Sequence, residues 1–233
     1  MKTQNILIAI ALFVAASVVG FAQTRSFDKE IAPWHKKATM QCGMLKADPV
    51  NAAQILKNVS ELQSELQVLS GKYLEHPPAE YANDPNWKSY FMTFAENLVV
   101  VKERVERKQF AQASLYCPNF CMTFGKMHKI NGTADLTDLV FAWRMEIKNT
   151  SDMVNTGNTA GANQNVSIVE GIYQKLIAMK SSKNDNSLNE LFKPLDAAYA
   201  AWLKAMKGAD KAGMNVALNS FMDGFAKPYL ATF

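Results

Sequence analysis

Two cysteines and a histidine share one predicted helical face in the middle of the chain. Cys117, Cys121 and His128 are spaced by four and then seven residues, and Phe124 falls on the same face. Thiolate and imidazole groups are ligands for soft and borderline metal ions. A free cysteine also packs in a core as a small apolar side chain. The spacing is therefore compatible both with metal binding and with simple packing.

A second group of sulfur-bearing side chains, Met40, Cys42 and Met44, lies near the start of the chain. If the helices that carry the two groups pack antiparallel, Met40 and Cys42 lie at the depth of Cys117. Thiolates and thioethers together favour copper(I). The candidate ligands of such a soft-metal site are Cys42, Met44, Cys117, Cys121 and His128.

The cysteines also allow a disulfide. Cys42 and Cys117 can link the two helices that carry them. Cys117 and Cys121 are poor partners for each other, because cysteines one turn apart on a helix do not readily meet disulfide geometry. A bond between Cys42 and Cys117 leaves Cys121 as a free thiol. The sequence leaves the disulfide, the metal site and the packed core all open.

Helices must position these residues. Apolar side chains step by three and four along two long segments, as in a helix with one buried stripe. The stripes are Ile55, Val59, Leu62, Leu66, Leu69 and Tyr73, then Trp87, Tyr90, Phe94, Leu98, Val101 and Val105. No segment alternates as a strand does. The predicted helices span residues 27–45, 49–74, 85–107, 109–129, 135–154, 164–181, 187–207 and 210–229.

Helix start signals accompany several of these segments. Asp48 and Asp84 each precede a proline, which predicts a capping carboxylate before a proline in the first helical position. Ser187 and Glu190 have the spacing of a capping box.

The second half of the chain repeats the first. A shift of 101 positions places Trp87 on Leu188 and keeps apolar positions in register over residues 86–128, and a shift of 109 places Trp34 on Trp143. Four helices of about 20 residues joined by short loops form an antiparallel bundle. We predict an all-α fold made of two tandem antiparallel four-helix bundles.

The first residues have the features of a secretory signal. Lys2 precedes an apolar run that starts at Ile6 and ends with small residues at Gly20 and Ala22. We predict cleavage after Ala22 and export to the periplasm or the medium, with an uncleaved anchor as the alternative. No later segment is apolar enough to predict a membrane span. The predicted domains are a signal peptide at 1–22 and bundles at 25–130 and 133–233.

Composition and motifs argue against several other classes of protein. The net charge of +4 is mild and evenly spread, so nucleic acid is not an expected partner. With 3 cysteines in 233 residues, the chain is not a disulfide-dense scaffold. The sequence contains no Gly-rich phosphate loop, no G-x-S-x-G and no H-E-x-x-H. We therefore expect a protein that is not an enzyme.

Taken together, the pattern resembles the cytochrome c′ family, whose members are exported four-helix bundles that carry haem on the last helix. The first helix of that family has an aromatic residue, a basic residue and spaced methionines. Trp34, His35 and the run from Met40 to Met44 are similar to it. The resemblance covers nearly all of the mature chain as two copies.

The family attaches haem through C-x-x-C-H, followed closely by an aromatic and a basic residue. Cys117 matches the first cysteine, while Phe120 stands at the second and Cys121 at the histidine. In the second half these positions hold Leu218, Phe221 and Met222. Both copies therefore depart from the motif at the residues that would hold haem.

The resemblance implies a haem-binding or electron-transfer ancestry. Phe120 cannot form the second thioether, so we expect no haem attached through two cysteines. A single thioether through Cys117, with Cys121, His128 or Met40 as the iron ligand, stays open, as does haem bound without a covalent link. Copper in place of haem, or no cofactor at all, stays open too. A redox or other protein partner and a second copy of the chain are the expected partners.

Overall fold

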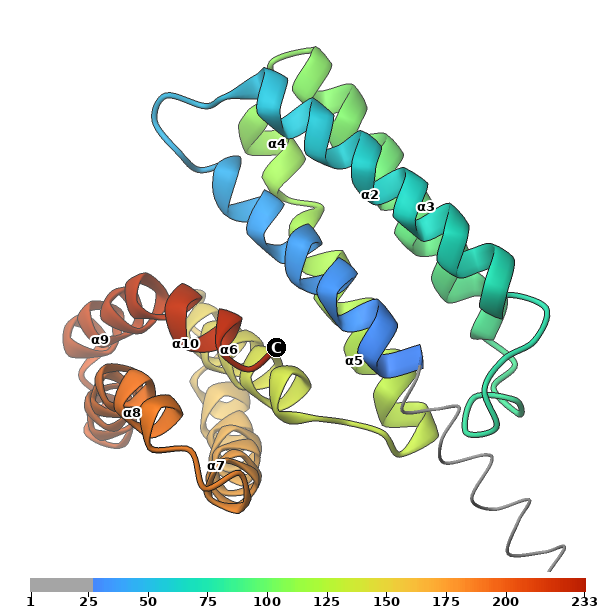
Figure 1. Ribbon diagram of the computed structural model, residues 1–233. Coiled ribbons are helices and arrows are strands. Elements are labelled where there is room, and N and C mark those ends of the chain that lie inside the picture. The colour runs from blue at the N-terminus through green and yellow to red at the C-terminus, as the bar shows by residue number, and fades with distance from the viewer. Residues whose placement is uncertain (1–26) are drawn as a thin grey trace, which may run out of the picture. The chain divides into compact units, whose positions relative to one another are not determined.

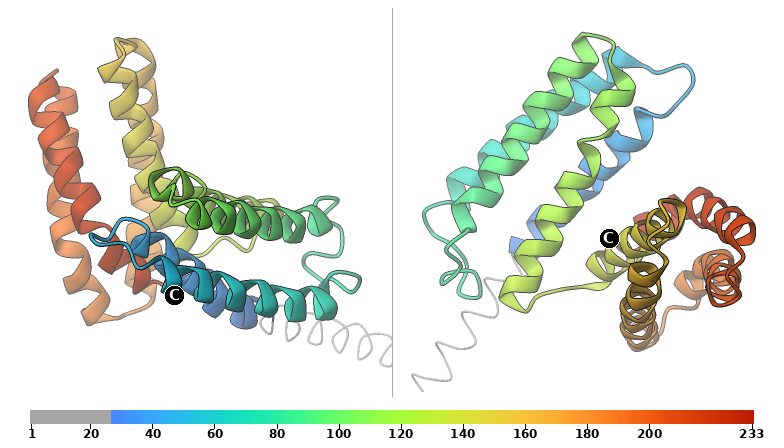
Figure 2. Two further views of the ribbon diagram at one scale, coloured as in Figure 1. Left: turned by 90° about the horizontal axis from the view of Figure 1, so that it is seen from above. Right: turned by 180° about the vertical axis from the view of Figure 1, so that it is seen from behind.

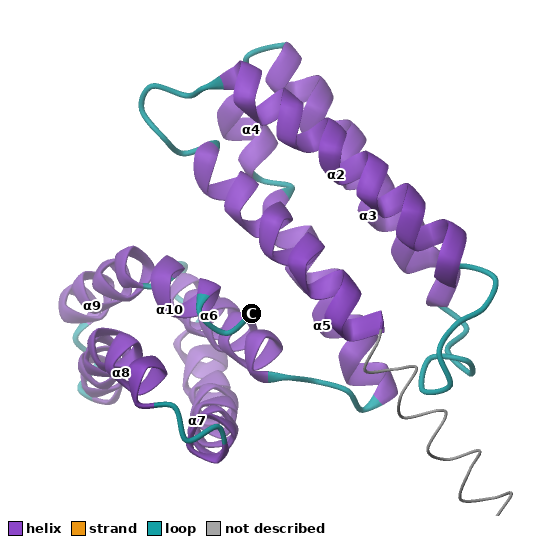
Figure 3. Ribbon diagram, viewed as in Figure 1, coloured by secondary structure: helices purple, strands orange, loops and turns teal. Residues whose placement is uncertain are grey.

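Helices are the only regular secondary structure in the part of the chain that the structure describes. The computed structural model describes residues 27–233, which form helices, turns and loops without any strand (Figure 3). The predicted all-α class is therefore confirmed. The predicted signal peptide, residues 1–22, lies outside the described residues. Among the described helices, none has both the length and the apolar character needed to cross a membrane.

The chain divides into two compact units between Thr133 and Ala134. The first unit begins, in its described part, with a helix at residues 27–44, which we call the first helix (Figure 1). It is followed by α2 (Ala52–Tyr73), α3 (Trp87–Glu106), α4 (Phe110–Ser114) and α5 (Cys117–Asn131). Helix α3 packs against α2 and α5. A hydrogen bond of 2.9 Å connects the first helix to α2, from Trp34 Nε1 to the carbonyl oxygen of Leu62.

The second unit contains the remaining helices. These are α6 (Leu136–Asn155), α7 (Thr159–Ser182), α8 (Asn186–Lys207), α9 (Lys211–Gly224) and α10 (Ala226–Leu230). Helix α6 packs along α7, and α8 packs along α9 (Figure 2). Helix α6 also contacts α9, which joins the two pairs.

The two apolar stripes seen in the sequence are the buried faces of their helices. Every member of the stripe from Ile55 to Tyr73 is buried in α2. Every member of the stripe from Trp87 to Val105 is buried in α3. A fully buried large apolar side chain stabilises a fold by about 1.5–3 kcal/mol, so these stripes hold the first unit together.

The predicted helix at residues 109–129 is two helices in the structure. Helix α4 ends at Ser114 and α5 begins at Cys117. Pro118 lies in the first turn of α5, where its missing N–H costs nothing. In one continuous helix its ring would clash with the carbonyl of Ser114. The break therefore places Cys117 at the start of a helix.

Two helices of the second unit also differ from their predicted bounds. The predicted helix at residues 210–229 divides into α9 and α10, with Pro228 in the short second piece. The predicted helix at residues 164–181 begins earlier, at Thr159, because the side chain of Asn158 caps an additional turn.

The predicted helix caps are wrong in their residues. Helix α2 is capped by Asn51 rather than by Asp48. Helix α8 is capped by Asp185, so the predicted capping box of Ser187 and Glu190 is not used. Asn and Asp are equally good caps, and the backbone bonds of the first turn decide between candidates a few residues apart.

Candidate functional site: a disulfide, a thiol and an imidazole in the first unit

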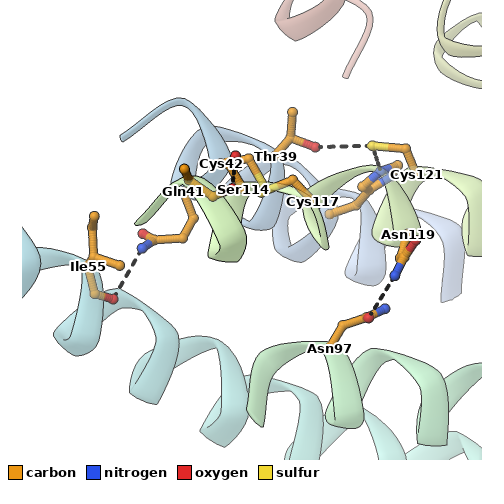
Figure 4. Close-up of a disulfide and its surroundings, with 11 residues drawn as sticks. Thr39, Gln41, Cys42, Ile55, Asn97, Ser114, Cys117, Asn119 and Cys121 are labelled. Carbon is orange, nitrogen blue, oxygen red and sulfur yellow. Dashed lines mark hydrogen bonds between the residues drawn. A yellow bond between two sulfur atoms is a disulfide. The ribbon is translucent and has the colours of Figure 1, made fainter. Parts of the chain in front are cut away.

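A disulfide joins the first helix to α5. Cys42 and Cys117 are bonded through their sulfur atoms, with 5.6 Å between their Cα atoms and 75 residues between them in sequence (Figure 4). This pairing, which the sequence allowed beside a metal site and a packed core, is confirmed. Both cysteines are partly exposed. The bond requires that the first helix and α5 lie side by side at this level.

Cys121 takes no part in the disulfide and lies one helical turn after Cys117 on α5. Its Sγ lies 3.4 Å from Nε2 of His35 and 3.8 Å from Oγ1 of Thr39, both on the first helix (Figure 4 shows the Thr39 contact). Cys121 is 7% exposed and His35 is 4% exposed. A cysteine and an imidazole thus meet in a buried setting beside the disulfide.

The ring of His35 is held in place by an aromatic neighbour. It stacks on Phe124 with 3.8 Å between centroids and 15° between planes. Phe124 itself stacks on Phe94 at 4.6 Å. Because Phe124 follows Cys121 by one turn on α5, the same helix presents both the thiol and the surface against which the imidazole rests.

The other predicted site residues lie apart from this group. Met40 has 52% of its surface exposed, so its side chain is directed away from the buried face. The sulfur of Met44 accepts a hydrogen bond of 3.4 Å from Nδ2 of Asn58, which lies on α2. His128 is buried on α5 about two turns beyond Cys121. Of the predicted set, the structure joins Cys42 to Cys117 and places Cys121 one helical turn after Cys117, in contact with residues of the first helix.

His35 was absent from the ligands predicted from sequence, although the resemblance had drawn attention to it as a basic residue. A usable signal was present, because residues 35 and 42 are seven apart and share one face of the first helix. Sequence spacing could not show that this face meets the cysteine face of α5.

The interior next to the site is filled by aromatic rings. Trp34 lies 5.2 Å from Phe94 and 6.0 Å from Phe120, measured between centroids. The sulfur of Cys117 is already bonded, so it cannot also form a thioether. With Met40 exposed, the residues of this unit as arranged do not fit a covalently attached haem.

At the other end of the first unit a buried carboxylate ties a loop to α5. Asp84 accepts hydrogen bonds from the Asn86 N–H (2.8 Å), the Tyr90 hydroxyl (2.9 Å) and Nδ2 of Asn131 (2.7 Å). Burial alone would raise the pKa of Asp84, but these hydrogen bonds outweigh it and lower the pKa. The predicted role of Asp84 as the cap of α3 is wrong, since that cap is Asn86.

The second unit has a comparable aromatic centre without sulfur or imidazole. Trp143 lies 5.0 Å from both Tyr173 and Tyr199 between centroids. Lys180 and the hydroxyl of Tyr173 both contact the carboxylate of Asp196, at 3.1 and 3.2 Å. Residues 134–233 contain no cysteine and no histidine. The chemistry of the chain is therefore concentrated in the first unit.

Comparison with known proteins found no family model, no curated protein and no solved structure that matches the chain.

Proposed function

We propose that this chain is an exported, non-enzymatic binding protein built from two cytochrome c′-like antiparallel four-helix bundles. In the first bundle a disulfide and aromatic packing have replaced covalent haem. The single observation that carries the proposal is the bond between Cys42 and Cys117. It occupies the sulfur that the family resemblance would assign to haem attachment.

The matching centres of the two units support the common origin of the bundles. Trp34 and Trp143, which the repeat pairs with each other, are both fully buried, and each lies among aromatic rings. Such paired positions are expected when one bundle is duplicated and both copies keep their core.

The disulfide supports export. Structural disulfides persist in oxidising compartments such as the bacterial periplasm and the extracellular medium. This agrees with the secretory features of residues 1–22.

The roles of the buried charged groups support a protein that binds rather than catalyses. Asp84 is satisfied by hydrogen bonds that join segments of the first unit. Lys180 and Asp196 are paired in the second. Each of these groups has a structural partner and a structural task.

The proposal is tested by producing the full chain in a Gram-negative bacterium that attaches c-type haem in its periplasm. We expect a mature N-terminus at Gln23, the mass of the apoprotein less two hydrogens, and no Soret absorption. A covalent haem on the wild-type chain, seen by mass and by absorption, would overturn the proposal, and an N-terminus at Met1 would overturn export.

A matched control shows that the host can attach haem to this chain. Phe120→Cys combined with Cys121→His restores C-x-x-C-H after Cys117, and Cys42→Ser frees the first sulfur. This triple variant should acquire covalent haem.

A further inference from the structure

Two lysines and a methionine follow the outer face of the first helix. Lys29, Lys36 and Met40 are spaced by seven and four residues, so they lie on the same side of this helix. The opposite side is buried in the core through Trp34 and Ala38, each 1% exposed. Lys29 and Met40 are exposed, and Lys36 is half-buried. This row of side chains therefore points out of the first unit.

A similar row follows α5. Met122, Lys126 and Lys129 are spaced by four and three residues, and all three are exposed. Phe124 and Met127, on the other side of α5, are buried in the core. Helix α5 therefore presents its lysines outward and its large apolar side chains inward.

The two rows are neighbours. The disulfide joins the end of the first helix to the start of α5, so the two helices lie side by side and run antiparallel (Figure 1). Thr39 contacts Cys121 (Figure 4), and Met40 and Met122 directly follow these two residues, so the methionines lie at the same level. The lysines continue from there in the same direction along both helices. We call this set the lysine face, which consists of Lys29, Lys36, Met40, Met122, Lys126 and Lys129.

The helices that carry the lysine face supply no acidic side chain to balance it. Residues 31–47 and α5 contain no Asp and no Glu. Asp28 and Glu30, at the start of the first helix, bond to a tyrosine hydroxyl and to Lys72. Within the part of the chain that the structure describes, none of the four lysines of the face forms an ion pair. Other lysines of the first unit are paired with glutamates, as Lys57 and Lys88 are.

We propose that the lysine face binds the anionic surface of a phospholipid membrane, with its lysines at the headgroup phosphates and its two methionines inserted between the lipids. Helices in contact lie about 8–10 Å apart, close to the Debye length at physiological salt, so unpaired lysines on the two helices repel one another. An anionic surface relieves this repulsion. The inference goes beyond the proposed function and does not depend on it.

The composition of the face favours lipid over protein. Protein interfaces are enriched in aromatic residues, Met and Arg and are depleted in Lys, whereas the lysine face contains no aromatic residue and no Arg. A lysine ammonium is a compact charge that needs no fixed bidentate geometry, which suits mobile headgroups. Methionine is flexible and apolar, and the stems of lysines cover apolar surface. Such a face lies in the interface of a bilayer without any helix that crosses it.

Sedimentation with vesicles tests the proposal. The mature protein, with its disulfide closed, is mixed with sucrose-loaded vesicles of phosphatidylglycerol and phosphatidylcholine in equal parts. We expect binding at low ionic strength and release in about 1 M sodium chloride, where the Debye length is about 3 Å. Vesicles of phosphatidylcholine alone, which carry no net charge, should not bind the protein.

Matched lysine variants separate the effect of the face from that of net charge. Lys36→Gln combined with Lys126→Gln should weaken binding to the anionic vesicles roughly 25-fold, because each lysine near such a surface contributes about fivefold. Lys57→Gln combined with Lys88→Gln removes the same charge from ion-paired lysines of α2 and α3 and should bind as the wild type does. Lys36→Arg combined with Lys126→Arg keeps the charge and should also bind as the wild type does.

Matched methionine variants separate a lipid surface from a soluble anion. Met40→Ser combined with Met122→Ser should weaken binding to the anionic vesicles roughly tenfold, because the apolar insertion is lost. The same variant should bind soluble poly-glutamate, the probe for an acidic protein, no differently from the wild type. Met92→Ser, at a methionine of α3 that is 62% exposed, is the control and should bind the vesicles as the wild type does.

Circular dichroism checks that each variant keeps the helix content of the wild type. Absence of salt-sensitive binding of the wild type to the anionic vesicles would overturn the proposal, and so would equal weakening by the two glutamine pairs. Full vesicle binding by the double methionine variant, or binding to poly-glutamate without binding to the vesicles, would overturn it in favour of an acidic protein. None of these results bears on covalent haem, by which the proposed function is judged.

Discussion

Asp84 stabilises the first unit in a way that depends on pH. Because its hydrogen bonds lower its pKa, the folded protein holds this proton less tightly than the unfolded chain does. The stabilisation is therefore complete above the unfolded value, 3.8, and is lost as the pH falls toward the lower pKa of the folded state.

We expect Asp84→Asn to lower the melting temperature near neutral pH and to flatten its decline below about pH 4. Melting curves followed by circular dichroism over this range provide the measurement. Asp48→Asn, at an exposed carboxylate of the same unit, should keep the steepness of the wild type. If the melting temperature of Asp84→Asn falls with pH as steeply as that of the wild type, the acid sensitivity comes from another group.

The individual residues of the site were predictable in part. The spacing of Cys117 and Cys121 placed them on one helical face, and a bond between Cys42 and Cys117 was one of the arrangements that the sequence allowed. The position of His35 beside Cys121 depends on how the first helix is rotated against α5. That rotation is set by the packing of large rings such as Trp34 and Phe124, which no local pattern encodes.

At the scale of the elements, α5 ends in a conformation that favours glycine. Gly132 has φ +69° and caps the helix, and a Cβ placed there would meet no atom within 4 Å. The cost of a side chain at this position is therefore one of backbone conformation rather than of space.

We expect Gly132→Ala to lower the free energy of unfolding by about 1 kcal/mol. Gly71, inside α2, also has open space around its Cβ position but has ordinary helical backbone. Gly71→Ala should raise stability by about 0.5 kcal/mol. Urea unfolding of both variants measures the difference, and equal effects of the two substitutions would contradict the backbone explanation.

The helices themselves were largely predictable from sequence, whereas their ends were not. The stripes from Ile55 and from Trp87 are long enough to define a buried face by spacing alone. The first residue of a helix depends on which of several nearby side chains caps it. For α2 the candidates are Asp48 and Asn51, and Asn51 is the cap. The break at Pro118 illustrates the same limit. The apolar spacing of residues 109–129 continues without interruption, although the proline ring prevents a single helix there and α4 gives way to α5.

At the scale of the whole molecule, only the first unit contains a covalent cross-link. A disulfide that closes a long loop typically contributes about 2–4 kcal/mol to stability, while the second unit, without cysteine, gains nothing from oxidation.

We expect a reductant to lower the melting temperature of the first unit and to leave that of the second unchanged, so that one thermal transition separates into two. Calorimetry with and without a phosphine reductant measures this. Cys42→Ser combined with Cys117→Ser should give the two transitions without reductant and should not respond to it. A parallel shift of both transitions would show that the units do not unfold independently.

The cross-link also makes most of the first unit a covalent ring. The bond joins residues 75 positions apart, and α2, α3 and α4 all lie within the segment it closes. A protease that cuts in the loop between α2 and α3 therefore leaves one linked molecule. Under a mechanical load applied to the two ends of the chain, the ring withholds roughly 26 nm of contour length until the disulfide is reduced. Once the first unit is unfolded by the load, the chain therefore extends less far in an oxidising compartment than in a reducing one.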